Sequence, residues 1–187
     1  LALGLWGTGA AAETRPLAQG IFGFGGVLTT GNMHQSARPL VVGYESNGIF
    51  GGGYQRLWSQ GESLSFGLEA GAAARLGGRA TGEFWAGAVI RHDSFALGPD
   101  TRLSSALTVG ISQITATHRG RESFLEQRYQ GSARRLFYLG PELILSSAAT
   151  PDREIFWRLH HRSGGGRTLG NMKGAANANV VGLRLRF

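Results

Sequence analysis

The chain has 187 residues, 31 of them glycine, no cysteine and a formal net charge of +7. This length suits one domain, and the glycine content suits short twisted strands better than helices. The lack of cysteine excludes a disulfide framework and a thiolate metal site. The positive charge would suit nucleic acid, anionic lipid or another phosphate-rich partner, but the chain has no nucleic-acid-binding motif, so we expect no nucleic acid to be bound.

The first twelve residues, LALGLWGTGAAA, are apolar and end in small residues. They are typical of the later part of a secretory signal with an Ala10-x-Ala12 cleavage site. We therefore predict a residual signal-peptide-like segment over 1–12 and a single outer-membrane β-barrel domain over 13–187. The alternative is a flexible apolar N-terminus or a plug strand.

Eight strands are predicted along the rest of the chain. The clearest pattern is in 62–74, where Leu64, Phe66 and Leu68 alternate with small and polar residues at a period of two. The first two strands are interrupted by glycines, which leaves their pairing open. The predicted ranges are 17–29, 41–58, 62–74, 82–91, 102–115, 135–146, 154–163 and 178–187.

One face of these strands is apolar and the other is small and polar, with charges of both signs. In a soluble sandwich or lipocalin-like binder the charges would face water; in a membrane barrel the apolar face meets lipid and the charges lie inside. The charges on the polar face are Glu69, Glu83, Arg91, Glu142, Arg158, Arg184 and Arg186.

Three observations favour the barrel. The strands are long enough to cross a bilayer when tilted. Short connections alternate with often longer ones, such as 30–40, 117–132 and 164–176. An even number of strands also leaves both termini on the periplasmic side. The predicted fold is therefore all-β, an eight-stranded antiparallel up-and-down transmembrane β-barrel in the bacterial outer membrane.

Eight strands leave no room for a water channel, because side chains fill so narrow a barrel. Charges buried inside it must pair with one another, since an unpaired buried charge is costly. We expect these charges to be structural. Outer-membrane lipids are the expected surroundings, and the barrel-assembly machinery is expected to bind the final strand, which ends at Phe187.

The only His-x-Ser of the chain lies at the end of the predicted strand 154–163, where His161 and Ser163 share the outward face. Serine needs a neighbouring base to become a nucleophile, and imidazole is the usual base near neutral pH. On the next strand Asn177 and Asn179 have the same outward parity, and one of them could orient the imidazole.

Oxyanion donors are expected from Asn171 and from the backbone N–H groups around Gly164. The alternative is structural. His and Ser at a barrel rim are ordinary interfacial residues, and Gly/Asn loops are ordinary turns.

In these residues the chain resembles the outer-membrane lipid A deacylases of the PagL type, small barrels with a catalytic His-x-Ser-Asn on the penultimate strand. His161 and Ser163 match the His-x-Ser, and Asn171 has the spacing of a loop Asn. Two positions depart from the pattern: Gly164 stands where the family has Asn, and Asn177 stands about where it has an acid. With Asn in place of the acid, the resemblance implies a slower enzyme, one with a changed substrate, or an inactive barrel.

The resemblance implies a hydrolase that removes an acyl chain from lipid A of lipopolysaccharide, with Ser163 as nucleophile, His161 as base and Asn177 as orienting residue. No cofactor or metal is expected. The alternative is a non-catalytic outer-membrane barrel with a structural or lipopolysaccharide-binding role, which predicts that His161 and Asn177 are not within hydrogen-bonding distance. The basic residues expected to hold lipid A phosphates are Arg119, Arg121, Arg128, Arg167 and Lys173.

Overall fold

The structure is a computed structural model that describes residues 18–59, 63–174 and 176–187. The predicted signal-like segment lies outside these residues, so the division of the chain at residue 12 stays a prediction. The elements are β1 (Gln19–Thr29), α1 (Met33–Ser36), β2 (Tyr44–Ser59), β3 (Leu64–Leu76), β4 (Thr81–Ala96), β5 (Thr101–Ile114), α2 (Arg121–Tyr129), β6 (Arg135–Ser147), β7 (Thr150–Ser163) and β8 (Asn177–Arg186).

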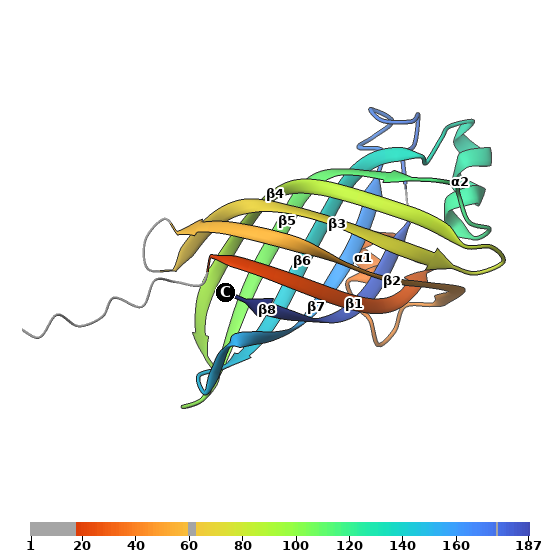
Figure 1. Ribbon diagram of the computed structural model, residues 1–187. Coiled ribbons are helices and arrows are strands. Elements are labelled where there is room, and N and C mark those ends of the chain that lie inside the picture. The colour runs from red at the N-terminus through yellow and green to blue at the C-terminus, as the bar shows by residue number, and fades with distance from the viewer. Residues whose placement is uncertain (1–17, 60–62, 175) are drawn as a thin grey trace, which may run out of the picture.

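The eight strands form one closed barrel in which every neighbouring pair is antiparallel (Figure 1). β1 pairs with β2 on one side and with β8 on the other, which settles the pairing that the sequence left open. Gln19 and Phe187 exchange backbone hydrogen bonds, so the first strand begins beside the end of the last. The predicted fold class is confirmed, and the soluble sandwich is wrong.

Glycines let β1, β2 and β3 lie close together. A Cβ on Gly52 would be 2.5 Å from the carbonyl oxygen of Phe22, and one on Gly51 would be 2.3 Å from that of Ala72. Only glycine fits at such contacts. The glycines that obscured the alternation in the sequence are therefore packing positions of a regular ladder.

The barrel interior is filled by paired charges and aromatic rings. Arg158 lies between Glu69 and Glu142, at 2.6 and 2.5 Å, and Arg184 joins Glu142 to Glu154 at 3.0 and 3.1 Å. The guanidinium of Arg158 also stacks on aromatic rings inside the barrel. The interior charges pair with one another, as predicted.

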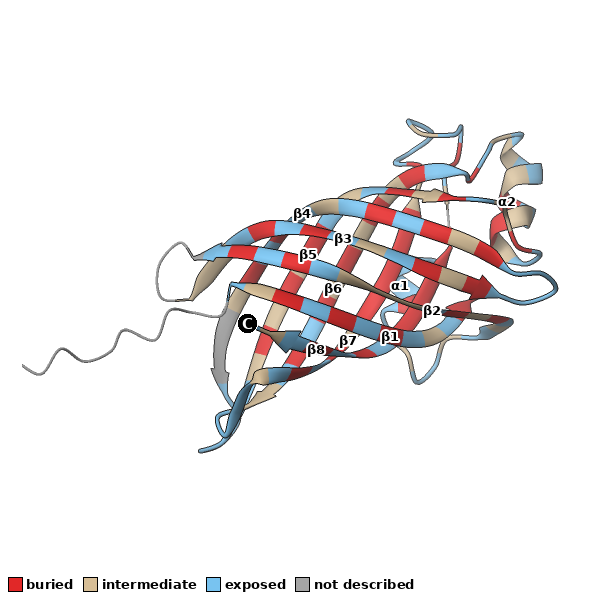
Figure 2. Cartoon of the chain, viewed as in Figure 1, coloured by how far each residue is buried: buried red, intermediate tan, exposed pale blue. Residues whose placement is uncertain are grey.

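The wall of the barrel is apolar on the outside, so that buried and exposed residues alternate along each strand (Figure 2). Large apolar side chains such as Leu68, Val109 and Leu183 have about half or more of their surface area exposed. Such a continuous exposed apolar wall is expected of a barrel surrounded by lipid. In the described part of the chain, no helix has both the length and the apolar character that crossing a bilayer requires.

Two helices were not predicted. α1 lies within the predicted connection 30–40 and α2 within 117–132. α2 covers the barrel end farther from the termini, and its Glu122 points inward, where it forms ion pairs with Arg75, at 3.0 Å, and with Arg162. The helix therefore closes the end that we assign to the cell exterior from the position of the termini.

Candidate active site

The candidate site lies at the outer ends of β7 and β8. His161 pairs with Asn177, and Leu159 pairs with Asn179. Residues directly opposite each other in an antiparallel ladder point to the same side. The neighbouring residues His160 and Arg162 point into the barrel, so these four side chains lie on its outer surface.

The imidazole of His161 is held by Asn177. Its Nδ1–H donates to Asn177 Oδ1 at 2.5 Å, and the amide of Asn177 donates to the carbonyl of Gly31 at 2.9 Å. A carbonyl can only accept, so the Gly31 contact fixes which end of the amide faces His161. The amide oxygen of Asn177 faces His161 and can only accept a hydrogen bond, so Nδ1 carries the proton. In a neutral ring Nε2 then keeps its lone pair. This is the tautomer that a general base needs.

His161 and its neighbours Asn177 and Leu159 are covered, in contrast to the expectation that His161 faces lipid. His161 is 8% exposed, Asn177 2% and Leu159 1%. The connection that contains α1, residues 30–43, covers Asn177, as the hydrogen bond from Asn177 to Gly31 shows. Alternation along a strand predicts which way a side chain points, but it does not predict that another segment folds over it.

Ser163 is half-buried and lies two residues beyond His161 on the same face. Its hydroxyl accepts a hydrogen bond from the backbone N–H of Gly165 at 3.3 Å. Within the described residues, no hydrogen bond joins Ser163 to the ring of His161. The structure thus brings His161 and Asn177 together, with Ser163 two residues farther along the strand, which corresponds to a rise of about 6.6 Å.

The two predicted oxyanion positions have structural roles in the loop after β7. Asn171 has a φ of 54°, and its side-chain amide donates to the carbonyl of Tyr129 at 2.8 Å, which ties the loop to α2. Gly164 packs against the carbonyl of Met172. Asn171 is therefore directed toward α2, and the Gly164 position has no space for a side chain.

The second outward asparagine, Asn179, belongs to a chain of hydrogen bonds that the sequence did not reveal. Trp157 Nε1 donates to Asn179 Oδ1 at 3.1 Å, and the Asn179 amide donates to the hydroxyl of Tyr44 at 3.3 Å. That hydroxyl donates to the carbonyl of Pro39 at 2.7 Å. The shared parity of Trp157 and Asn179 was a signal for the first bond, but nothing local predicts Tyr44 or Pro39.

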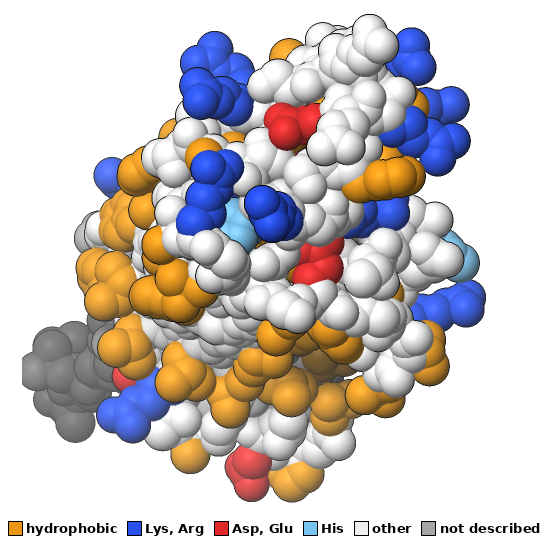
Figure 3. All heavy atoms as spheres, turned by 90° about the vertical axis from the view of Figure 1, so that its right-hand side faces the viewer, with side chains coloured by type: hydrophobic (Ala, Val, Ile, Leu, Met, Phe, Trp, Pro, Cys, Tyr) orange, Lys and Arg blue, Asp and Glu red, His pale blue; other side chains and the backbone are white. Residues whose placement is uncertain are grey.

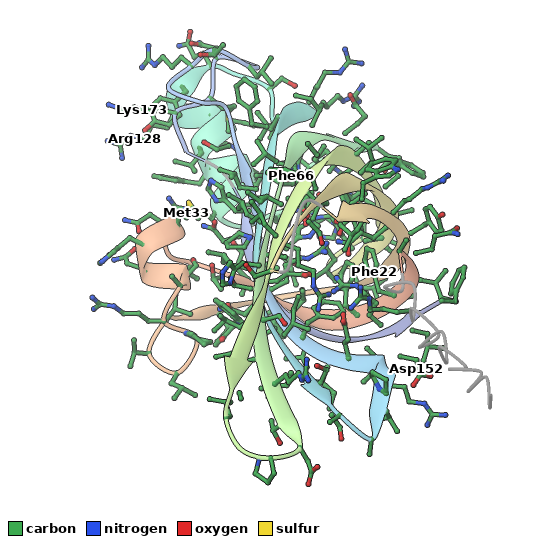
Figure 4. The ribbon with its side chains drawn as sticks, turned by 90° about the vertical axis from the view of Figure 1, so that its left-hand side faces the viewer. Phe22, Met33, Phe66, Arg128, Asp152 and Lys173 are labelled. Carbon is green, nitrogen blue, oxygen red and sulfur yellow. The ribbon has the colours of Figure 1, made fainter. Side chains whose placement is uncertain are left out.

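The predicted phosphate-binding residues do not form one group. Figure 3 looks onto the outer end and shows Lys and Arg side chains around its rim. Arg128 and Arg167 lie over the ring of Tyr129, at 6.0 and 5.3 Å from its centroid, and Arg128 and Lys173 extend from the same lobe (Figure 4). Arg121 donates to the carbonyl of Thr30 at 3.1 Å, which joins α2 to the connection 30–43.

Arg119 belongs to a separate cleft of about 600 Å³, which it lines together with Arg79 and His118. The structure therefore unites Arg128 and Arg167 at one ring and separates them from Arg119. The described residues contain no group of three or more His, Asp or Glu side chains placed to hold a metal ion.

Comparison with protein-family models gave no match, and comparison with curated proteins gave none. Among solved structures, the outer-membrane enzyme PagL is 12% identical with a TM-score of 0.62, over 90% of this chain and 99% of that one. The N-terminal β-barrel domain of Pseudomonas aeruginosa OprF is 11% identical with a TM-score of 0.50, over 91% and 98%. Neisserial surface protein A is 12% identical with a TM-score of 0.51, over 90% and 97%.

At these identities the likeness extends to the fold and no further. It includes an enzyme as well as barrels whose names state no activity, so it does not select a function. With its closed barrel, charged interior and apolar outer wall, the chain is a bacterial outer-membrane β-barrel, as predicted.

Proposed function

We propose that the protein hydrolyses an acyl ester of lipid A at the outer surface of its barrel, with Ser163 as nucleophile, His161 as general base and Asn177 as orienting residue. The observation that carries this proposal is the pair of hydrogen bonds that joins His161, Asn177 and Gly31. Together they orient the ring with a proton on Nδ1, which leaves Nε2 to take a proton from a hydroxyl on the same face.

The reaction follows from these roles. The Ser163 hydroxyl leaves the Gly165 N–H, turns toward His161 and attacks the ester carbonyl while Nε2 takes its proton. The bond from the carbonyl carbon to the sugar oxygen then breaks, and Nε2–H returns the proton to that oxygen. Water hydrolyses the acyl-serine by the same base and releases the fatty acid. The N–H of Gly165, once freed from Ser163, is a candidate donor to the oxyanion.

Asn177 sets the expected rate. An amide oxygen orients the imidazole but carries no charge to stabilise the imidazolium that forms during attack. Replacing the acid of a Ser-His-Asp site by Asn costs about 10⁴ in rate, partly through the wrong tautomer. Here the Gly31 contact enforces the productive tautomer, so we expect a slow hydrolase and not an inactive one.

The test is to incubate the folded protein with lipopolysaccharide and to measure lipid A by mass spectrometry. We expect the loss of one acyl chain, with release of the matching fatty acid, and we expect Ser163→Ala to abolish it. Ser105→Ala is the matched control, because Ser105 also lies on the outward face, but on β5. Unchanged lipid A, or a loss that Ser163→Ala does not affect, would refute the proposal.

A second candidate function is a non-catalytic barrel that binds lipopolysaccharide. The bond from the Gly165 N–H to Ser163 favours it, because the hydroxyl then serves to shape the loop. In that case Ser163→Ala changes the stability of the loop and leaves lipid A intact in both proteins. The close contact of His161 with Asn177 is the observation against this candidate.

A further inference from the structure

The connection between β1 and β2 folds back over the outside of the barrel instead of extending away from it. It includes α1 and projects as a separate lobe from the side of the barrel, where Met33 is labelled in Figure 4. Gly31 contacts Asn177, and Tyr44 joins Pro39 to Asn179. The segment therefore contacts the outer wall at two successive outward positions of β8.

These two contacts lie at different depths along the barrel wall, measured from its outer end. Asn179 is two residues farther than Asn177 from the outer end of β8, and its partner Trp157 is four residues below His161 on β7. Pro39 is thus tied to a level of the wall nearer the middle of the membrane than the His161–Asn177 pair. The next outward residue of β8, Val181, belongs to the exposed apolar wall, with 58% of its area accessible.

The residues that follow Pro39 are apolar and exposed. Leu40 is 97% exposed and Val41 is 76% exposed. Because Pro39 is tied through Tyr44 to Asn179 on the outer wall, they are held beside a lipid-facing surface, where large apolar side chains are expected to meet lipid. Tyr44 and Trp157, whose polar atoms take part in the hydrogen-bond chain, are residue types enriched at the membrane boundary.

The same segment also has a pocket with basic residues in its lining. A pocket of about 490 Å³ is lined by His34 and Arg38 together with Gly31 and Val41. A guanidinium is well suited to a phosphate oxygen pair. The segment thus combines exposed apolar residues, Leu40 and Val41, with a basic pocket that Val41 also lines, which suits the acyl chains and the phosphate of a lipid.

We infer that the segment 30–43 is a membrane-inserted lip, with Leu40 and Val41 among the acyl chains of the outer leaflet and Arg38 at the level of the lipid phosphates. The hydrogen bonds from Asn179 through Tyr44 to Pro39 hold the lip against the wall. This inference is independent of hydrolysis, because it concerns where the segment lies and not what the site does.

The chain has no cysteine, so each single Cys variant takes one nitroxide label. Leu40→Cys, Val41→Cys and Arg38→Cys are labelled in the full-length barrel in vesicles of phosphatidylethanolamine and lipopolysaccharide. For each nitroxide label, the rate of collision with molecular oxygen, which is more concentrated in lipid, is compared with the rate of collision with a water-soluble nickel complex. Leu183→Cys on the apolar wall serves as the lipid reference, and Arg119→Cys in the outer cleft as the water reference.

We expect the labels at Leu40 and Val41 to collide more with oxygen than with the nickel complex, as the Leu183 label does. The ratio of the two collision rates for the Arg38 label should lie between those of the two references. If Leu40 and Val41 match the Arg119 label, the lip does not insert and the inference is wrong. Tyr44→Phe removes the bond to Pro39 while it keeps the ring, so the Leu40 label should shift toward the water reference. An unchanged Leu40 label in Tyr44→Phe would overturn the role of the hydrogen-bond chain.

Discussion

Gly164 lies so close to the carbonyl oxygen of Met172 that a Cβ at this position would be 1.9 Å from it. The Asn that the PagL-type pattern has after the serine is therefore incompatible with this loop. The loop is closed from both sides, since the N–H of Leu169 donates to the carbonyl of Gly164 and the N–H of Met172 donates to that of Leu169. Any oxyanion donor here has to come from the backbone.

We expect Gly164→Ala to destabilise the protein by about 1–3 kcal/mol, because the new methyl group forces Met172 to move. Lipid A hydrolysis should fall with it, since the same loop holds Ser163. Unfolding in urea and the deacylation assay measure both effects. Gly78→Ala is the control, because a Cβ on Gly78 meets nothing within 4 Å; equal stability of the two variants would contradict the packing argument.

Asn177→Ala should lower the turnover of lipid A by about 10²-fold or more, because the imidazole loses the acceptor that fixes its tautomer. Gln113→Ala, a polar position near the outer end of β5, should leave turnover within a few-fold of the unchanged protein. Rates of fatty acid release from lipopolysaccharide give the comparison. Wild-type turnover in Asn177→Ala would exclude Asn177 as the orienting residue.

Arg158→Leu should reduce the free energy of unfolding by about 3–5 kcal/mol, because Glu69 and Glu142 lose their shared partner inside the barrel. Arg153→Leu, on the same strand, removes an exposed arginine 3.7 Å from Asp152. That change should cost less than about 1 kcal/mol. Urea titrations of both variants measure the difference, and similar values would mean that the interior pairs contribute little.

His118 makes stability depend on pH. It is buried beside the outer cleft, where burial and the nearby charge of Arg75 lower its pKa below the usual value of about 6.5. The unfolded chain then binds more protons below that value, so stability should be full above pH 6.5 and fall as the pH decreases toward the lowered pKa.

Unfolding measured between pH 5 and 8 tests this expectation. His118→Gln should remove the part of the slope of unfolding free energy against pH that His118 causes. A slope that is unchanged in His118→Gln would assign the pH dependence to other groups.

The fold was predictable because alternation needs only local information. The parity of Glu69, Arg158 and Arg184 was enough to place these charges on one face. Strand length, the alternation of short and long connections and the even number of strands then favoured the interior for this face. α2 was not predictable in the same way. Leu125 is its one buried apolar residue, so a helical apolar stripe is missing. The helix is held by the packing of Leu125 in a small cluster with Leu136 and Met172, and by the ion pairs of Glu122.

The site was predictable where it depends on register and not where it depends on loops. The parity of His161 and Asn177 brought them to one face, and strand pairing then made them neighbours. Asn171, in contrast, turns to the carbonyl of Tyr129, which lies 42 residues away in sequence. Gly31, which covers Asn177, lies 146 residues away from it in sequence, and no local pattern indicates this contact.

The middle and the outer end of the barrel interior are filled, with Arg158 and its carboxylates in the middle and Glu122 of α2 at the outer mouth. A ligand of this protein that comes from the lipid therefore arrives by lateral diffusion in the plane of the leaflet. Its encounter rate depends on molecules per unit area of membrane, so assays in detergent micelles, where lipid is diluted by surfactant, will underestimate it at equal bulk concentration.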